Sequence, residues 1–267
     1  MSILPRRLRH GEQAPLTDHL DELRKRLVLA LLSVAVAFAG TYAFHSAIVR
    51  WLMRPLPPEH RRLLTFTVAE PFVTSFTVAL YAAFVIALPL VMYQGWAFLA
   101  PAFERRWQRA LQGLVAFAGV LAGLGIVFGY YVVLPAAVHF LTNYDSHLYE
   151  IQIRARDYFS FVTTVLLAVT VVFELPMFML GLIQLRVLSY QRLKRNRRLG
   201  YVLMAVIAVA LPGVDPVTTT LEMLPLMVLF EGSIWMAYYI ERRRQRREAR
   251  EIALDADADL GAGGASG

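Results

Sequence analysis

Two long uncharged runs constrain this chain more than any other feature of its sequence. Pro71 to Phe103 and Ala110 to Tyr144 contain no Asp, Glu, Lys or Arg over 33 and 35 residues. About 20 helical residues cross a hydrocarbon core roughly 30 Å thick, because each residue advances an α-helix by about 1.5 Å. Since 57% of the 267 residues are hydrophobic, a soluble core could not bury them all, and lipid must be part of the solvent.

Four further segments are apolar but differ in length. They are residues 27–49, 158–185, 199–211 and 217–240. The third has 13 residues, which is about 20 Å of helix and too short for a full span. The fourth contains Glu222, Pro225 and Glu231. We therefore predict an all-α integral membrane protein with six transmembrane helices, of which helices five and six are short. A single re-entrant hairpin is the alternative for these last two.

The basic residues predict the orientation in the membrane. Of the 27 Lys and Arg residues, 21 fall in four segments that lie on one side of the predicted spans, namely 1–26, 104–109, 186–198 and 241–250. Cytoplasmic segments carry the excess of Lys and Arg, so both termini are expected in the cytoplasm. The clusters between spans explain the net charge of +7 without a nucleic-acid partner.

Three regions follow from this topology. We predict a cytoplasmic N-terminal segment with a short amphipathic helix at residues 1–26, a transmembrane domain at residues 27–240, and a basic, then disordered, cytoplasmic tail at residues 241–267. The tail ends in acidic, Gly and Ala residues, a composition with little apolar surface to bury.

Several kinds of chemistry are excluded by composition. The chain has no cysteine, so disulfides, thiolate metal sites and Cys nucleophiles cannot occur, and its six histidines lack metal-ligand spacing. No phosphate-binding loop and no intramembrane protease motif is present. We expect no metal, no cofactor and no enzymatic activity.

Glu174 is the sequence's strongest candidate for a functional group inside the membrane. It lies well inside the fourth apolar segment, where a carboxylate costs several kcal/mol unless it is protonated, paired or hydrated. A structural alternative is a neutral Glu174 bonded to a backbone group that Pro176 leaves free. Another is a proton relay in a proton-coupled secondary transporter, although no inverted repeat supports it.

Two acidic residues near the membrane surface have competing interpretations. Leu20, Leu23 and Leu27 recur at helical spacing and predict an amphipathic helix that runs into the first span. In it, Glu22 and Arg26 form an i,i+4 pair, and spacing alone favours that structural role. Glu104 is the only acid in the loop predicted from Tyr93 to Arg106, and it either neutralises adjacent arginines or binds a cationic partner.

Other short motifs point to a known family. The motifs, in order, are HLDELRKRL, AEPF, YQGWAFLAPAF followed by ERR, VFGYYVVLPAAVHFL, DYFSF, FELP, and DPVT with a later LFEG. They extend from residue 19 to residue 232. In sequence order and spacing they resemble the TatC family, the receptor and core subunit of the twin-arginine protein translocase.

The resemblance implies a cupped, glove-like bundle of six helices that binds signal peptides with paired arginines on folded cargo. By position, the family's arginine-pair site corresponds to Glu22 and Glu104, with Arg24 and Phe98 nearby. The family's acid in the fourth helix corresponds to Glu174. The acid of its last external turn corresponds to Asp215.

The chain departs from the family pattern around this turn. Family members often carry Gln at the position of Thr219, so the polar surface of helices five and six differs here, and Glu222 is a candidate for part of its role. The implied partners are single-span TatA/TatB-type subunits, the lipid bilayer and further copies of the chain. The implied location is a bacterial, archaeal or plastid-type cytoplasmic membrane, with the proton-motive force as the energy source.

Overall fold

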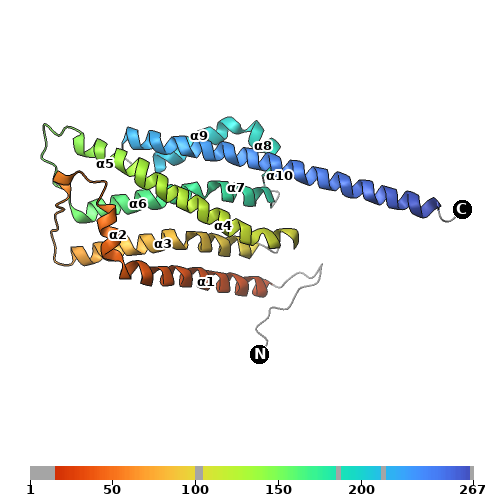
Figure 1. The fold of residues 1–267 in the computed structure, drawn as a ribbon, viewed down its shortest axis with the longest axis horizontal. Coiled ribbons are helices and arrows are strands. Elements are labelled where there is room, and N and C mark those ends of the chain that lie inside the picture. Colours follow the sequence, from red (N-terminus) through yellow and green to blue (C-terminus); the bar gives the residue numbers. More distant parts are fainter. Residues whose placement is uncertain (1–15, 100–104, 185–187, 212–214, 265–267) are drawn as a thin grey trace, which may run out of the picture. The chain divides into compact units, whose positions relative to one another are not determined.

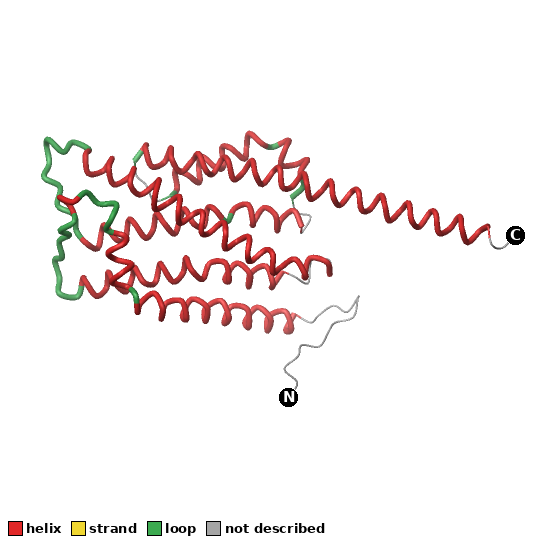
Figure 2. The backbone as a smooth tube through the Cα atoms, in the orientation of Figure 1, coloured by secondary structure: helices red, strands yellow, loops and turns green. Residues whose placement is uncertain are grey.

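A computed structural model describes residues 16–99, 105–184, 188–211 and 215–264 of the chain. Within these ranges the structure consists of helices and connecting loops, and its only β-pairing is an isolated parallel bridge between Leu64 and Arg154 (Figure 2). The prediction of an all-α fold is confirmed for this part of the chain. Backbone groups in lipid have no water to bond, and a helix satisfies them within one segment.

The helices follow the apolar runs (Figure 1). In chain order they are α1 (Leu16–Ala43), α2 (His45–Leu52), the 3₁₀ helix η1 (Pro58–His60), α3 (Glu70–Leu99), α4 (Arg105–Phe128), the π-helix η3 (Gly129–Val133), α5 (Leu134–Asn143), α6 (Ala155–Phe173), α7 (Leu175–Gln184), α8 (Tyr190–Arg195), α9 (Arg197–Ala210) and α10 (Pro216–Gly264).

Five helical stretches in the described ranges are long and apolar enough to cross a membrane. They are His19–Ala43, Glu70–Phe98, Ala116–Asn143, Ala155–Ile183 and Pro216–Arg243. Helix α9 has 14 residues, about 21 Å of helix, and is shorter than these. A sixth span is therefore not confirmed. The prediction that the last span is short is not confirmed either, because the apolar stretch of α10 has 28 residues.

The described residues form two compact units. The first contains those within Met1–Arg54, Pro58–Ala122 and Gln152–Thr163. In it α1 lies beside α3 (Figure 1), and the Thr41 hydroxyl donates a hydrogen bond of 2.8 Å to the carbonyl of Ala79. Phe38 of α1 packs edge-on against Phe76 of α3. Most leucines of α1 are exposed, as expected for a helix that faces lipid.

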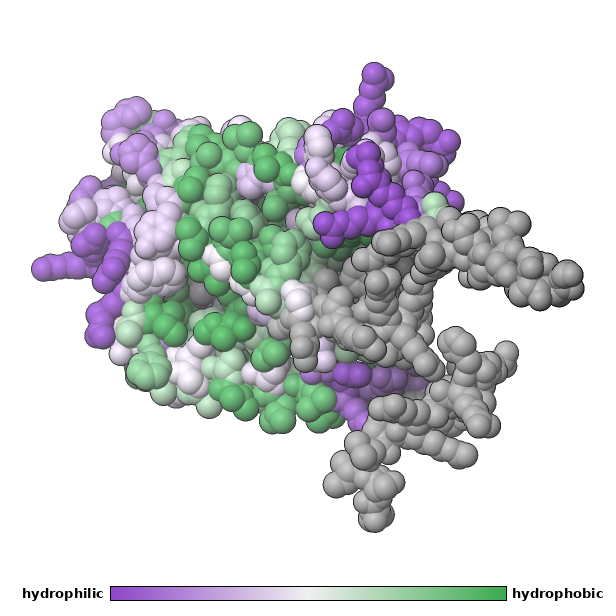
Figure 3. All heavy atoms as spheres, turned by 45° about the vertical axis from the view of Figure 1, so that its right-hand side comes forward, coloured by the Kyte–Doolittle hydropathy of each residue, from purple (hydrophilic) through white to green (hydrophobic). Residues whose placement is uncertain are grey.

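The second unit contains the described residues of Pro55–Pro57, Gly123–Ile151 and Thr164–Gly267. Its core joins α7, α8 and α9 to α10 through Ile183, Leu193, Met204, Ala208 and buried residues of α10 that include Leu226 and Phe230. Exposed apolar residues cover the middle of the helices, and hydrophilic residues gather at their ends (Figure 3). This distribution matches a chain whose helices contact lipid along their middle.

Prolines account for two interruptions of the helices. Pro135 has no N–H to donate to the carbonyl four residues earlier, and the π-helix η3 lies directly before it. Pro176 likewise lies just after Glu174, where α6 ends and α7 begins. The fourth predicted span is thus two helices in sequence.

The C-terminal part of α10 differs from the prediction. We expected a disordered segment up to residue 267, yet the helix continues to Gly264. The helix reaches residues 255–264 from residues 241–254, which consist largely of Arg, Glu, Ala, Leu and Gln, residues of high helix propensity.

Two glycines of α4 allow a matched test of helix packing. A Cβ at Gly125 would lie 2.9 Å from the Cα of Thr170, whereas a Cβ at Gly123 would meet nothing within 4 Å. We predict that Gly125→Ala lowers the free energy of unfolding by about 1 to 3 kcal/mol, because backbone cannot move aside as a side chain can. Gly123→Ala should leave it unchanged or raise it by up to about 1 kcal/mol. Unfolding in detergent measures both, and equal effects would contradict the packing.

Candidate functional site

The start of α1 and the end of α3 come together in the first unit. The rings of His19 and Phe98 stack with centroids 4.4 Å apart. Two turns further along α1, Arg26 Nη1 donates a hydrogen bond of 3.3 Å to Gln94 Oε1. The segment before the first span and the segment after the second, which are separate in sequence, therefore lie together at one end of the α1–α3 pair. We call His19, Glu22, Arg26, Gln94 and Phe98 the α1–α3 site.

Glu22 already binds a guanidinium group at this site. Arg26 Nη2 lies 3.2 Å from Glu22 Oε1, and the two side chains are 29% and 34% exposed, respectively. The predicted i,i+4 pair is confirmed. Because an exposed pair contributes only about 0 to 1 kcal/mol, a second guanidinium could compete for this carboxylate.

The other predicted site residues near this end have different environments. Arg24 is exposed, and Phe98 is half-buried. Residues 93–99, predicted as part of a loop, continue helix α3 instead, because no proline or charge interrupts the apolar pattern there. Glu104 lies outside the described residues.

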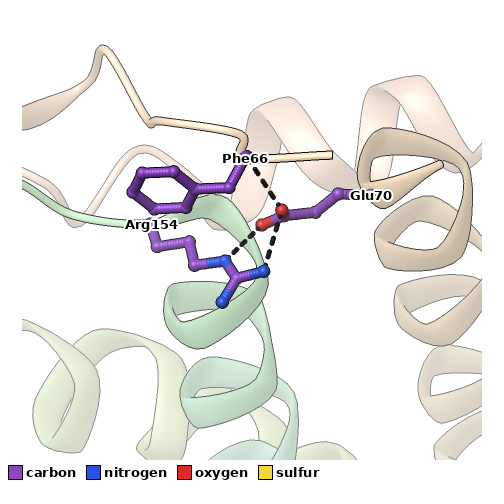
Figure 4. Close-up of polar contacts among 3 residues, drawn as sticks. All are labelled: Phe66, Glu70 and Arg154. Carbon is purple, nitrogen blue, oxygen red and sulfur yellow. Dashed lines mark hydrogen bonds and ion pairs between the residues drawn. The ribbon is translucent and has the colours of Figure 1, made fainter. Parts of the chain in front are cut away.

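A partly buried ion pair, which the sequence did not reveal, joins distant segments of the first unit. Arg154 donates hydrogen bonds of 2.8 and 3.0 Å to the two carboxylate oxygens of Glu70, and the Phe66 N–H donates one of 3.0 Å to Glu70 Oε2 (Figure 4). The Glu70 side chain is 2% exposed. The hydrogen bonds to the Glu70 carboxylate raise the pKa of Arg154, so the guanidinium group remains a cation.

Backbone contacts reinforce this pair. The Leu64 N–H donates to the Ile153 carbonyl and the Ala155 N–H donates to the Leu64 carbonyl, both at 2.9 Å. The Tyr158 hydroxyl donates to the carbonyl of Leu52 over 2.7 Å. Together these bonds fix the segment before α3 to the start of α6. The sequence placed Glu70 at a helix start, but nothing in the spacing indicated a partner 84 residues away.

Two buried glutamates of the second unit have no hydrogen-bond partner. Glu174 is 1% exposed and Glu222 is 2% exposed, and neither pair of carboxylate oxygens makes a hydrogen bond within the described residues. The alternative in which Glu174 bonds a backbone group freed by Pro176 is therefore wrong. A carboxyl group in this situation costs roughly 1 to 3 kcal/mol or more unless something else binds it.

Asp215 begins α10 as its N-terminal cap. Its Oδ1 accepts a hydrogen bond of 2.7 Å from the Thr218 N–H, and its Oδ2 accepts one of 2.5 Å from the Thr218 hydroxyl. Pro216 then occupies the first helical position, where its missing N–H has no cost. Thr219 bonds back to the Asp215 carbonyl at 3.0 Å. The predicted turn residue thus fixes the point where α10 starts.

Glu231, predicted only as an interruption of the last apolar segment, anchors α9 to α10. It accepts hydrogen bonds from Arg197 and from the Tyr201 hydroxyl. The described residues contain no group of three or more His, Asp or Glu side chains placed to hold a metal ion.

Comparisons with known proteins identify the family. The family model for the "Sec-independent protein translocase protein (TatC)" matches residues 18–225. The chain belongs to the TatC family. The TatC protein of Magnetococcus marinus is 32% identical over 246 residues, covering 91% of this chain and 90% of the relative. The TatC protein of Escherichia coli K12 is 31% identical over 238 residues, covering 88% and 92%.

A solved structure agrees with this assignment. The crystal structure of the twin-arginine translocase receptor TatC in DDM has a TM-score of 0.72 and 28% identity to this chain, and covers 82% of this chain and 99% of that one. The TatC family is a multi-pass membrane family of the protein translocase and is not a known enzyme family. These matches do not favour the alternative of a proton-coupled transporter.

The Glu70–Arg154 pair yields a test of the contacts before α3. We predict that Glu70→Gln lowers the unfolding temperature in detergent and that Glu70→Ala lowers it further. Both changes leave the guanidinium of Arg154 without its counter-charge, and Ala also leaves the Phe66 N–H without its acceptor. Glu59→Gln is the control, because Glu59 is exposed in η1. An unfolding temperature unchanged in both Glu70 variants would contradict a stabilising role for the pair.

Proposed function

We propose that this chain is the receptor subunit of a twin-arginine translocase, and that it binds the paired arginines of signal peptides on folded cargo. The observation that carries the proposal is the α1–α3 site, where the partly exposed Glu22 already accepts a hydrogen bond from a guanidinium group. A receptor for basic peptides requires carboxylates of this kind at the membrane surface.

The chemistry of the site fits two adjacent arginines. A guanidinium fork binds a carboxylate through two parallel hydrogen bonds, which lysine cannot match. In this proposal Glu22 and Glu104 each bind one arginine, and Phe98 provides an apolar wall for the residues that follow. Arg24 lies on the same helical segment as Glu22. Arg26 leaves Glu22 when a peptide binds and keeps Gln94 as its acceptor.

Partner subunits of the TatA and TatB single-span kind complete the translocase in this proposal, together with further copies of the chain. The proton-motive force supplies the energy, which agrees with the absence of a phosphate-binding loop from the sequence. The family assignment supports these partners, because the translocase is the shared context of the relatives.

The proposed arrangement in the membrane has six spans in a cupped bundle, with α9 as the short fifth span. The segment 1–26 and the basic segment from residue 241 lie in the cytoplasm of a bacterial, archaeal or plastid-type cell or organelle, flanking the transmembrane domain at residues 27–240. The distribution of Lys and Arg supports this orientation.

Single cysteines test this topology directly, because the chain has none of its own. We predict that a membrane-impermeant thiol reagent added outside labels Cys at positions 60 and 147, and does not label Cys at positions 195 and 246 until the membrane is opened. Labelling of position 246 from outside would overturn the orientation.

We further propose that Glu174, Thr219 and Glu222 contact a partner's transmembrane helix, and that Asp215 lies in the external turn. A hydrogen-bond donor on a partner would satisfy the carboxyl groups of Glu174 and Glu222, which have none among the described residues.

Replacement of Glu222 by leucine separates a contact role from a structural one. We predict that Glu222→Leu raises the free energy of unfolding of the isolated chain by about 1 kcal/mol or more, because it removes a buried, unsatisfied carboxyl group. Transport should nevertheless fall. Thr220→Leu, at an exposed position of the same helix, is the control. Full transport by Glu222→Leu would remove Glu222 from the partner surface.

Peptide affinity tests the receptor site. A hydrogen bond to a charged group contributes roughly 1.5 to 3 kcal/mol, so Glu22→Ala should weaken binding of a paired-arginine signal peptide by about tenfold to a hundredfold. Asp21→Ala removes the same charge from an exposed neighbouring position and should change the affinity by about twofold or less. Equal losses in both variants would indicate general attraction between charges instead of a site at Glu22.

A further inference from the structure

Helix α8 and the end of the α10 span are held together by aromatic and polar contacts within the second unit. The Tyr190 N–H at the start of α8 donates a hydrogen bond of 3.0 Å to Glu241 Oε2. The rings of Tyr190 and Tyr238 pack with centroids 5.1 Å apart. The basic loop before α9 is thereby attached to α10 at the point where its apolar span ends.

Each of these two rings has a cation next to it. Lys194 Nζ lies 5.8 Å from the centre of the Tyr190 ring, and the Arg242 guanidinium lies 5.7 Å from the centre of the Tyr238 ring. Arg242 also donates a hydrogen bond of 3.1 Å to the Tyr238 hydroxyl. Arg246 is one helical turn beyond Arg242 on the same face.

Arg195 and Arg243 follow Lys194 and Arg242 directly in sequence and are exposed as well. We call Lys194, Arg195, Arg242, Arg243 and Arg246 the basic surface, and all five are exposed.

Few described acids oppose these five cations. Glu241 carries the nearest carboxylate in sequence; it accepts the backbone N–H of Tyr190 and offsets one of these positive charges. Glu231 is bonded to Arg197 and Tyr201. Among the described residues, the basic surface therefore keeps a net positive charge.

The location of the basic surface selects one kind of anion. Its arginines lie just beyond Tyr238 and Tyr239, at the end of the apolar stretch Pro216–Arg243 of α10. Tyrosines concentrate at the depth of the lipid headgroups, and clustered Lys and Arg residues directly beyond a span attract anionic lipids. A phosphodiester at this depth can accept hydrogen bonds from arginine forks.

We propose that the basic surface is a binding site for the phosphate of an anionic phospholipid such as phosphatidylglycerol or cardiolipin. The lipid phosphate lies between Lys194 and the arginines of α10, and its acyl chains run along the apolar part of α10. Bound lipid then bridges α8 and α10, and it stabilises the attachment of the loop before α9. The proposal does not depend on the receptor function.

Native mass spectrometry of the full chain in detergent, titrated with phosphatidylglycerol or phosphatidylcholine, tests the site. The triple variant Lys194→Gln, Arg242→Gln, Arg246→Gln should bind the first phosphatidylglycerol roughly a hundredfold more weakly, because each basic residue near the lipid surface contributes about a factor of five. Affinity for phosphatidylcholine should not change. Arg242→Lys with Arg246→Lys should retain most of the affinity, since the charge remains.

The control removes the same charge at exposed arginines of the first unit, as Arg50→Gln, Arg54→Gln, Arg62→Gln, and should bind phosphatidylglycerol as the parent does. Soluble glycerol phosphate should not displace the lipid if the acyl chains contribute. The proposal is overturned if the triple variant binds phosphatidylglycerol like the parent, if the control loses as much affinity, or if an acidic peptide binds the basic surface while phosphatidylglycerol does not.

Discussion

The hydrogen-bonding demand of the backbone in lipid underlies the rest of this structure. When an apolar segment enters the lipid, its backbone N–H and C=O groups have no water to bond and must form hydrogen bonds within the segment. An α-helix forms all of these bonds internally. Two irregular points of the helices lie beside a proline, which has no N–H to donate. Pro135 follows the π-helix η3, and Pro176 follows the junction of α6 and α7. Glu174 lies at that junction, so the residue of greatest functional interest in the span lies where the backbone is irregular.

Polar groups are arranged differently in the two units. In the first, buried Glu70 is fully satisfied by Arg154 and Phe66, and it joins two segments that are distant in sequence. In the second, Glu174 and Glu222 are equally buried but have no partner within the described residues. A satisfied carboxylate stabilises a fold, whereas an unsatisfied one costs free energy. This contrast separates a structural acid from the acids that we assign to partner contact.

The sequence predicted what depends on local spacing and composition. The uncharged runs predicted the long helices, the i,i+4 spacing predicted the Glu22–Arg26 pair, and the motifs predicted the family. The sequence did not predict the Glu70–Arg154 pair or the stacking of His19 on Phe98, because both depend on how distant segments pack. It also placed disorder in residues 255–267, whereas α10 continues to Gly264 from an arginine-rich segment of high helix propensity. For the candidate site, the residues and the local partner of Glu22 were therefore predictable, whereas the contacts between α1 and α3 were not.

Recognition of paired arginines at the α1–α3 site is the central claim, and photocrosslinking tests it most directly. A photoreactive amino acid at position 98 should crosslink to a signal peptide with two arginines, and the crosslink should disappear when both arginines become lysines, because lysine lacks the guanidinium fork. The same probe at exposed Leu148 should give no crosslink with either peptide. Equal crosslinking of both peptides at position 98, or equal crosslinking at positions 98 and 148, would contradict the account.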